Sequence, residues 1–198
     1  MLVREAMTSP VVTIPTSATV RQAIRVLLEH DLTALPVVDE SGRLAGIVSE
    51  TDLLHHVFEH DPRAFTRRPA TAASPAPRRV EEVMTRDVEI TLPNADFAVL
   101  AETMLKARIT NVPVMAGSEV VGIVSSRDLI AVLARDDARI RDDVLAAIAE
   151  YGPDGPRWDV SVHDGVVRLR GRADASAQRI ADVIARAIPG VTSVSIED

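Results

Sequence analysis

Apolar residues recur at the spacing of a helix in two separate stretches of the first 135 residues. The two stripes comprise Val20, Ala23, Ile24, Leu27 and Leu28, and then Phe97, Leu100, Ala101, Met104 and Leu105. Each stripe follows polar residues typical of helix starts, with Asn94 as the candidate N-cap of the second. In the first copy an apolar stretch at 11–14 ends at Pro15, and apolar runs at 35–38 and 44–48 precede a closing helix. The pattern predicts the order β-α-β-β-α, twice.

The two copies share three sequence blocks in the same order, which marks them as an internal repeat. The blocks are VREAMT and VEEVMT at 3–8 and 80–85, LPVV and VPVM at 35–38 and 112–115, and GIVSETDL and GIVSSRDL at 46–53 and 122–129. The offset between the copies is 77 residues for the first two blocks and 76 for the last.

The hydrophobic period changes after Arg135. The elements that the pattern predicts there are a helix over 140–148, strands over 158–162 and 167–169, a helix over 180–188 and a strand over 191–196. His163-Asp164-Gly165 supplies a hairpin turn between the first two strands, and Pro189-Gly190 stops the second helix. The order is therefore α-β-β-α-β.

Together these patterns predict an α/β (α+β) fold with four parts. We expect a first repeat at 1–58, a second repeat at 80–135 and a small C-terminal domain at 136–198. The segment 59–79 between the repeats is rich in Pro, Ala, Thr and Arg, which is typical of a flexible linker.

Composition narrows the classes of function. Of the 198 residues, 46% are hydrophobic and 26% charged, as in globular proteins. The formal net charge of −7 argues against non-specific binding to nucleic acid, and the absence of cysteine rules out disulfides and thiolate catalysis. No signal-peptide pattern is evident, and no apolar run approaches the roughly 18 residues of a spanning helix. We expect a cytoplasmic protein with no nucleic-acid partner.

The third block, GIVSETDL and GIVSSRDL, contains Ser-x-x-Asp in both copies, at Ser49/Asp52 and at Ser125/Asp128, where a strand is expected to run into a helix. Free N–H groups at a helix N-terminus attract phosphate, and an aspartate one turn away can accept hydrogen bonds from two ribose hydroxyls. Ser and Asp at such places are also ordinary helix caps. Both interpretations stay open.

The order Met-Thr, Pro-Val and Gly-Ile-Val-Ser-x-x-Asp-Leu, present twice over residues 1–135, resembles the CBS domain family. The resemblance implies a regulatory adenine nucleotide of the AMP, ADP or ATP class in a cleft between the repeats, with no cofactor required. It places the ribose on Asp52 and Asp128, beside Ser49 and Ser125. The other residues implied at the cleft are Ile47 and Ile123 as apolar walls, Arg127, and Thr33, Ala34, Thr110, Asn111, Thr8 and Val11 as lining residues.

Ala34 and Asn111 stand where family members that bind polyphosphates tightly often carry basic residues. Arg127 is the only basic residue within either GIVS block. This departure favours an alternative in which the repeats form a ligand-free scaffold for dimerisation and attachment, whereas the Ser-x-x-Asp pairs favour a nucleotide sensor. Either way we expect a homodimer formed through the repeats.

Residues 160–171, VSVHDGVVRLRG, followed later by Pro189-Gly190-Val191, resemble the BON domain family. This resemblance implies attachment to a protein partner or a phospholipid surface. Arg168, Arg170 and Arg172 form a basic stripe on the middle strand, which would suit anionic headgroups. They would equally suit ion pairs with acidic neighbours such as Asp159, or plain solvation.

Neither a metal site nor a catalytic site is predicted. His56 and His60 are four apart and could share a helix face, but two ligands without a third do not predict a metal site. No nucleophile–base constellation, phosphate loop or carboxylate pair is evident, so the sequence predicts that the protein is not an enzyme.

Overall fold

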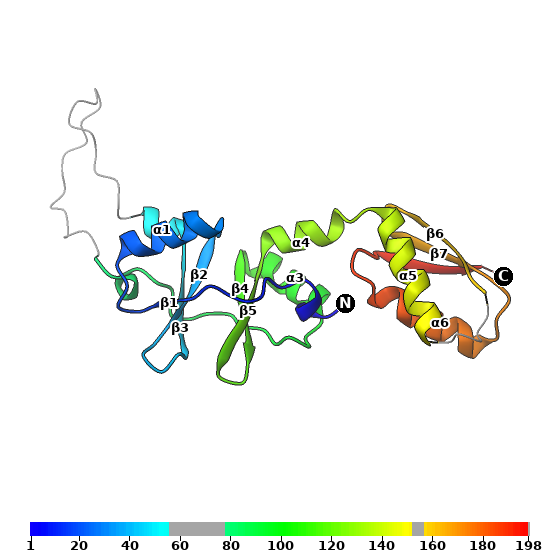
Figure 1. Cartoon of the computed structure of the whole chain (residues 1–198), viewed down its shortest axis with the longest axis horizontal. Coiled ribbons are helices and arrows are strands. Elements are labelled where there is room, and N and C mark those ends of the chain that lie inside the picture. Colours follow the sequence, from blue (N-terminus) through cyan, green and yellow to red (C-terminus); the bar gives the residue numbers. More distant parts are fainter. Residues whose placement is uncertain (56–77, 152–156, 198) are drawn as a thin grey trace, which may run out of the picture. The chain divides into compact units, whose positions relative to one another are not determined.

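The computed structural model describes residues 1–55, 78–151 and 157–197 (Figure 1). His56, His60 and nearly all of the predicted linker at 59–79 lie outside these residues. Among the residues described, no helix combines the length and the apolar character needed to cross a membrane.

The first repeat forms in the predicted order. Its elements are β1 (Ile14–Pro15), α1 (Val20–His30), β2 (Ala34–Val38), β3 (Leu44–Ser49) and α2 (Glu50–Leu54). The strands form one sheet in the order β1-β2-β3, with β1 parallel and β3 antiparallel to β2. The predicted strand at 11–14 is reduced to β1, because only Ile14 and Pro15 pair with β2.

The second repeat contains α3 (Phe97–Ala107), β4 (Asn111–Ala116), β5 (Glu119–Ser125) and α4 (Ser126–Leu133). β4 and β5 form a two-stranded sheet, and the counterpart of β1 is a single parallel bridge between Thr91 and Val114. The N-cap of α3 is Asp96, not Asn94: its carboxylate accepts hydrogen bonds from the N–H groups of Ala98 and Val99. Asp96 stands immediately before the first helical residue, which is the position where a side chain reaches those donors.

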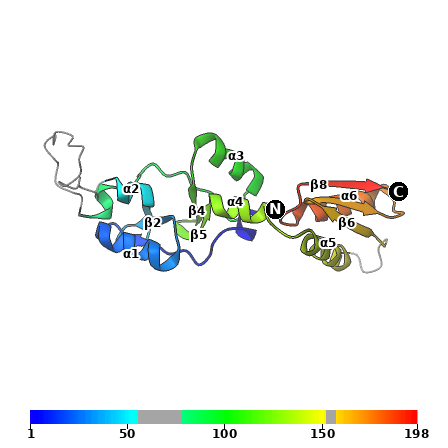
Figure 2. The same ribbon diagram turned by 90° about the horizontal axis from the view of Figure 1, so that it is seen from above.

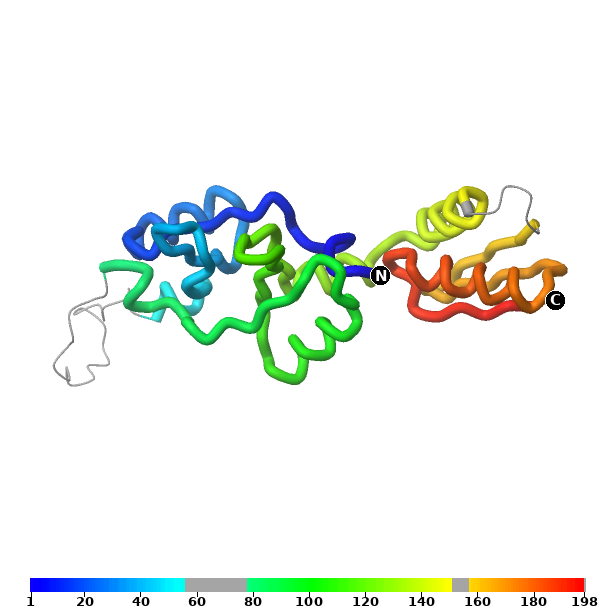
Figure 3. The backbone as a smooth tube through the Cα atoms, turned by 90° about the horizontal axis from the view of Figure 1, so that it is seen from below, coloured from blue at the N-terminus to red at the C-terminus, as the bar shows by residue number. Residues whose placement is uncertain are grey.

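The start of the chain packs against the second repeat. The short 3-10 helix η1 (Val3–Glu5) begins with the Val3 N–H donating to the Ala95 carbonyl (3.0 Å), and the Arg4 N–H donates to the Pro93 carbonyl (2.9 Å). Val3 is fully buried. Figure 3 shows the blue N-terminal end meeting the green segment that precedes α3.

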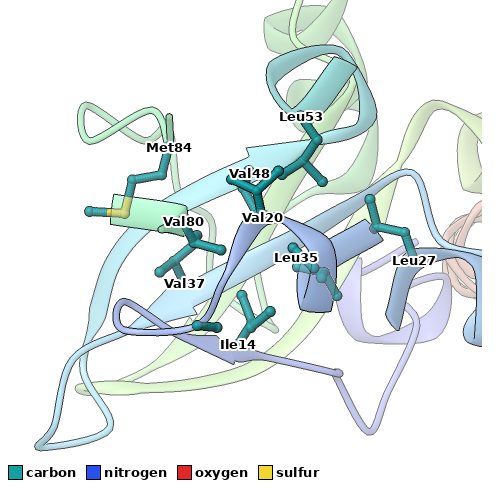
Figure 4. Packing of buried hydrophobic residues seen from close by; sticks show 11 residues of the cluster. Ile14, Val20, Leu27, Leu35, Val37, Val48, Leu53, Val80 and Met84 are labelled. Atoms are coloured by element: carbon teal, nitrogen blue, oxygen red, sulfur yellow. The ribbon is translucent and has the colours of Figure 1, made fainter. Parts of the chain in front are cut away.

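The start of the second repeat packs reciprocally against the first. η2 (Val80–Glu82) begins with the Val80 N–H donating to the Ala18 carbonyl (2.9 Å). Val80 and Met84 belong to the hydrophobic core of the first repeat, together with residues such as Leu35 and Val48, and Figure 4 shows both among the side chains of this cluster. The two repeats therefore exchange their first segments.

Each exchanged first segment belongs to the compact unit that contains its hydrogen-bond partners. One compact unit comprises Met1–Met7, Pro93–Thr110 and Val124–Asp198, and the other comprises Thr8–Leu92 and Asn111–Ile123. Neither unit coincides with one sequence repeat, because each includes segments from both.

The C-terminal domain has the predicted order (Figure 2). Its elements are α5 (Asp137–Tyr151), β6 (Asp159–His163), β7 (Val166–Arg170), α6 (Ala175–Ala187) and β8 (Ser193–Glu197). The sheet order is β6-β7-β8, with β6 antiparallel and β8 parallel to β7. Its core is separate from that of the first repeat and is built from Ile140, Val144, Val160, Val167, Leu169, Ala181 and Ala185.

Candidate functional site

Ser49 and Asp52 meet at the junction of β3 and α2. The backbone N–H of Ser49 donates to Asp52 Oδ2 (2.8 Å), and Ser49 Oγ donates to the same oxygen (2.7 Å). In return the Asp52 N–H donates to Ser49 Oγ (3.3 Å). The serine follows a strand and caps a helix, so its extended backbone directs the hydroxyl toward the free N–H groups of the first turn.

Ser125 and Asp128 repeat this geometry at the junction of β5 and α4. The Ser125 N–H and Oγ donate to Asp128 Oδ2 at 2.6 and 2.7 Å, and the Asp128 N–H lies 3.4 Å from Ser125 Oγ. The same four-residue motif therefore forms the same capping box twice.

The capping interpretation of Ser-x-x-Asp is thus confirmed, and it leaves part of each carboxylate available. Both hydrogen bonds to each aspartate fall on Oδ2, whereas Oδ1 accepts none from the part of the chain that the structure describes. Asp52 and Asp128 are both half-buried. A role in holding a ligand remains a prediction, and capping does not oppose it.

The residues before the Pro-Val strands lie at the same helix starts. The Thr33 carbonyl accepts from the Glu50 N–H (3.0 Å), and the Thr110 carbonyl accepts from the Ser126 N–H (2.9 Å). In the first repeat, Thr33 Oγ1 also donates to Asn111 Oδ1 (3.0 Å). Asn111 is the one buried polar residue among those described, at 8% exposed.

Two of the predicted lining residues are paired directly, since the N–H groups of Thr8 and Ile123 each donate to the other's carbonyl (2.9 and 3.1 Å). Ile47 pairs in the same way with Thr85 (2.9 Å in both directions). Thr85 stands at the position of Thr8 in the second repeat, at the 77-residue offset, and is not among the residues that the sequence places at the cleft.

The remaining lining residues differ in exposure. Ala34 is buried at the start of β2, and Val11 is half-buried in the irregular segment before β1. Thr110 and Arg127 are exposed.

The basic stripe of the C-terminal domain is interrupted by an ion pair. Arg170 Nε lies 2.7 Å from Glu197 Oε2 on the neighbouring strand, so the partner is Glu197, while Asp159 lies opposite on the other strand. The hydrogen bond and charge of Glu197 raise the pKa of Arg170, and those of Arg170 lower the pKa of Glu197. Arg168 stands between Ser161 and Ser195 and forms no ion pair with any residue described.

Asp137, His163 and Asp164 bring one potential ligand atom each to within 4.8 Å of one another. Asp137 already has a structural role, because its two carboxylate oxygens accept hydrogen bonds from the N–H groups of Asp164 and Gly165 (2.9 Å each). These two hydrogen bonds lower the pKa of Asp137. His163 and Asp164 are almost fully exposed, and the hydrogen bonds of Asp137 close the turn between β6 and β7.

Comparison with known families gives the geometry its context. The family model for the CBS domain matches residues 3–59 and 80–135. The chain belongs to the CBS domain family. The model for the BON domain matches residues 136–197, so the chain carries a CBS pair followed by a BON domain.

Relatives share the CBS pair. The chain is 30% identical over 129 residues to the L-aspartate semialdehyde sulfurtransferase of Methanocaldococcus jannaschii, a match that covers 65% of this chain but only 22% of that enzyme. A solved CBS domain pair in complex with 5′-methylthioadenosine and S-adenosyl-L-methionine is 28% identical, with a TM-score of 0.55, covering 66% of this chain and 94% of that one. The CBS domain of a CBS domain-containing membrane protein from Sphaerobacter thermophilus is 28% identical, with a TM-score of 0.53, covering 66% and 86%.

Proposed function

We propose that the CBS pair is a non-catalytic regulatory module that binds an adenosine-containing ligand between its repeats. The observation that carries this proposal is the pair of Ser-Asp boxes, each of which leaves Oδ1 of a half-buried aspartate without a hydrogen-bond donor among the described residues. A ribose presents two adjacent hydroxyl donors, which suit such an acceptor. A CBS pair with the same fold and 28% identity holds two adenosine-containing ligands.

The chemistry around the boxes favours ligands with few phosphates. Ala34 and Asn111 offer no positive charge where tight polyphosphate binding would need it, and the GIVS blocks contribute only Arg127. The N-terminus of α4 can still favour one anionic group through its dipole. We therefore expect AMP or S-adenosylmethionine to bind more tightly than ATP.

Isothermal titration of the nucleotide-stripped full chain with AMP, ADP, ATP and S-adenosylmethionine tests the proposal. Asp52→Ala and Asp128→Ala should weaken the best ligand at least about tenfold, at whichever repeat it contacts. Gln22→Ala is the matched control, because it removes the same third-position partner from the capping box of Thr19 in α1, outside the candidate site. Absence of binding from the folded chain, or equal losses in the control, would contradict the proposal and favour the ligand-free scaffold.

The homodimer is the second part of the proposal. Four apolar residues at equivalent helix positions of the two repeats are exposed: Leu28 (76%) and Leu105 (75%), and Leu54 (49%) and Ile130 (67%). A surface repeated in this way suits a partner related by two-fold symmetry. Leu28→Glu together with Leu105→Glu should convert a dimer to a monomer in sedimentation velocity, with unchanged thermal stability of each chain. A wild-type monomer at all concentrations would contradict this part.

The BON domain is proposed as the interaction part of the molecule. Arg168 is the specific observation in favour of an anionic partner, because two serines flank it on the open face of the sheet and no acid neutralises it by direct contact among the described residues. Co-sedimentation with phosphatidylserine vesicles tests the lipid surface, and Arg168→Ala should reduce the bound fraction. If vesicles do not bind, a protein partner is the remaining form of this alternative.

A further inference from the structure

We propose that Arg135 couples ligand binding at the second repeat to the BON domain, an inference that rests on the proposed function. α4 begins at the Ser125–Asp128 box and ends at Leu133. Only residues 134–136 separate it from α5, the first helix of the BON domain. The helix that carries the candidate site is therefore joined to the BON domain by a very short connection.

Arg135 ties this connection to two different elements. Its Nη1 donates to the Pro189 carbonyl (2.9 Å), in the turn between α6 and β8, and its Nη2 donates to Asp143 Oδ2 (2.8 Å), on α5. The side chain is 23% exposed, so both contacts are partly shielded from water. A planar guanidinium with two fixed partners holds its own backbone more tightly than a single flexible ion pair would.

The turn that Arg135 contacts is itself closely packed. Gly190 has φ +93°, and a Cβ there would lie 2.8 Å from Ile140 Cδ1 and 3.2 Å from Arg135 Cβ. Ile140 is 1% exposed, in the core of the BON domain. A movement of Arg135 would therefore displace the turn at Pro189–Gly190, which packs directly against that core.

Within one chain, apolar packing does little to hold α4 at its far end. Ile130 is 67% exposed and Leu133 is 71% exposed. Both line a groove of about 860 Å³ together with Ile188 and Val191 of the α6–β8 turn. The hydrogen bonds of Arg135 to the Pro189 carbonyl and to Asp143 are therefore the polar link that we propose for the connection.

The helix supplies the path for the coupling. The eight residues of α4 extend about 12 Å and move as a unit, because each turn is hydrogen-bonded to the next. A ligand that draws Asp128 toward it shifts the first turn, and Arg135 passes that shift to Pro189. A ligand can bias the joint in this way only as far as it binds one arrangement better than the other.

Hydrogen–deuterium exchange on the full chain, with and without AMP and with and without S-adenosylmethionine, tests the coupling. In the wild type the bound ligand should change the amide exchange rates of residues 188–193 by about fivefold or more. Arg135→Ala should bind the same ligand by titration yet lose that change. Arg135→Lys should lose most of it, since lysine keeps the charge but lacks the planar fork whose two nitrogens reach Pro189 and Asp143 at once. Arg141→Ala is the control, because it removes an exposed arginine of α5 whose partner is the adjacent Asp142.

The outcomes separate this inference from the proposed function. If neither ligand binds in the titration, both are overturned. If a ligand binds and exchange at 188–193 does not respond in the wild type, or responds equally in Arg135→Ala, the coupling is overturned and the proposed function stands.

Discussion

Carboxylates at helix starts behave differently in the CBS repeats and in the BON domain. Asp52 and Asp128 each concentrate their two hydrogen bonds on Oδ2, whereas Asp137 uses both oxygens on the N–H groups of Asp164 and Gly165. All three lie in the first turn of a helix, so residue type and rough position do not separate them. Among the described residues, the difference is that Oδ1 of Asp52 and of Asp128 accepts no hydrogen bond, whereas both oxygens of Asp137 do.

The CBS repeats and the BON domain also differ in how their hydrophobic cores are completed. The repeats complete each other through exchanged first segments, whereas the BON domain builds its core from its own helices and strands. A substitution in an exchanged segment should therefore destabilise both repeats, while a substitution in the BON core should lower the stability of the BON domain alone.

Val80→Ala has the largest expected effect on this comparison. Val80 is fully buried, so the lost methyl groups and the cavity should lower the free energy of unfolding by about 2 to 3 kcal/mol. Hydrogen exchange should speed up in α1 and around Ala18, which belong to the first repeat. Val3→Ala is the reciprocal variant and should act around Ala95 and α3. Faster exchange confined to the repeat that carries the substitution would contradict the segment exchange.

Ser49→Ala and Ser125→Ala should each cost about 1 kcal/mol in urea unfolding, because each removes a helix cap. The two losses should be similar, since the two boxes have the same geometry. Ser41→Ala, in the exposed turn between β2 and β3, is the control and should have little effect. A large loss for only one serine would show that the two junctions are not equivalent.

Asp137→Asn should destabilise the BON domain by less than the loss of a serine cap destabilises its repeat, and this effect should depend on pH. Because hydrogen bonds lower the pKa of Asp137 from its ordinary value of 3.8, its stabilising effect is present at neutral pH and disappears as the pH falls through the folded-state pKa. Thermal unfolding should separate variant and wild type at pH 7 and bring them together in acid. Asp142→Asn is the control, and a gap independent of pH would contradict the assignment.

Arg170→Ala should have the smallest effect. The Arg170–Glu197 pair lies on the exposed face of the sheet, where ion pairs contribute little and salt screens them. Thermal unfolding in low and high salt should show nearly the same midpoint for variant and wild type. A clear loss that high salt abolishes would show that this pair stabilises the sheet.

The sequence predicts most helices and strands well, because the hydrophobic period and the helix-capping residues are local signals. The order of the first repeat and of the BON domain, that of the second repeat apart from its first strand, and the helix starts at Ser49 and Ser125 follow from residues a few positions apart. Partners distant in sequence could not be predicted in the same way. The blocks VREAMT and VEEVMT are so alike that either could fit either repeat, so their exchange is invisible in the pattern.

The same limit applies to polar contacts. Glu197 as the partner of Arg170, and the hydrogen bond between Thr33 and Asn111, depend on strand register and on packing between distant segments. For the candidate site, the sequence predicts the helix starts at Ser49 and Ser125, which the structure shows, while ligand binding there stays a prediction. The oxygen on which the hydrogen bonds fall depends on side-chain geometry that only the structure describes.

The exchange of first segments has a consequence for how the chain is made. A ribosome adds residues from the N-terminus at about 5–20 per second, so Val3 emerges several seconds before Ala95, to which it will be bonded. Likewise, the hydrophobic core of the first repeat is complete only once Val80 has been synthesised. The two repeats thus finish together during synthesis, and a ribosome stalled between them would hold a first repeat that cannot yet complete its core.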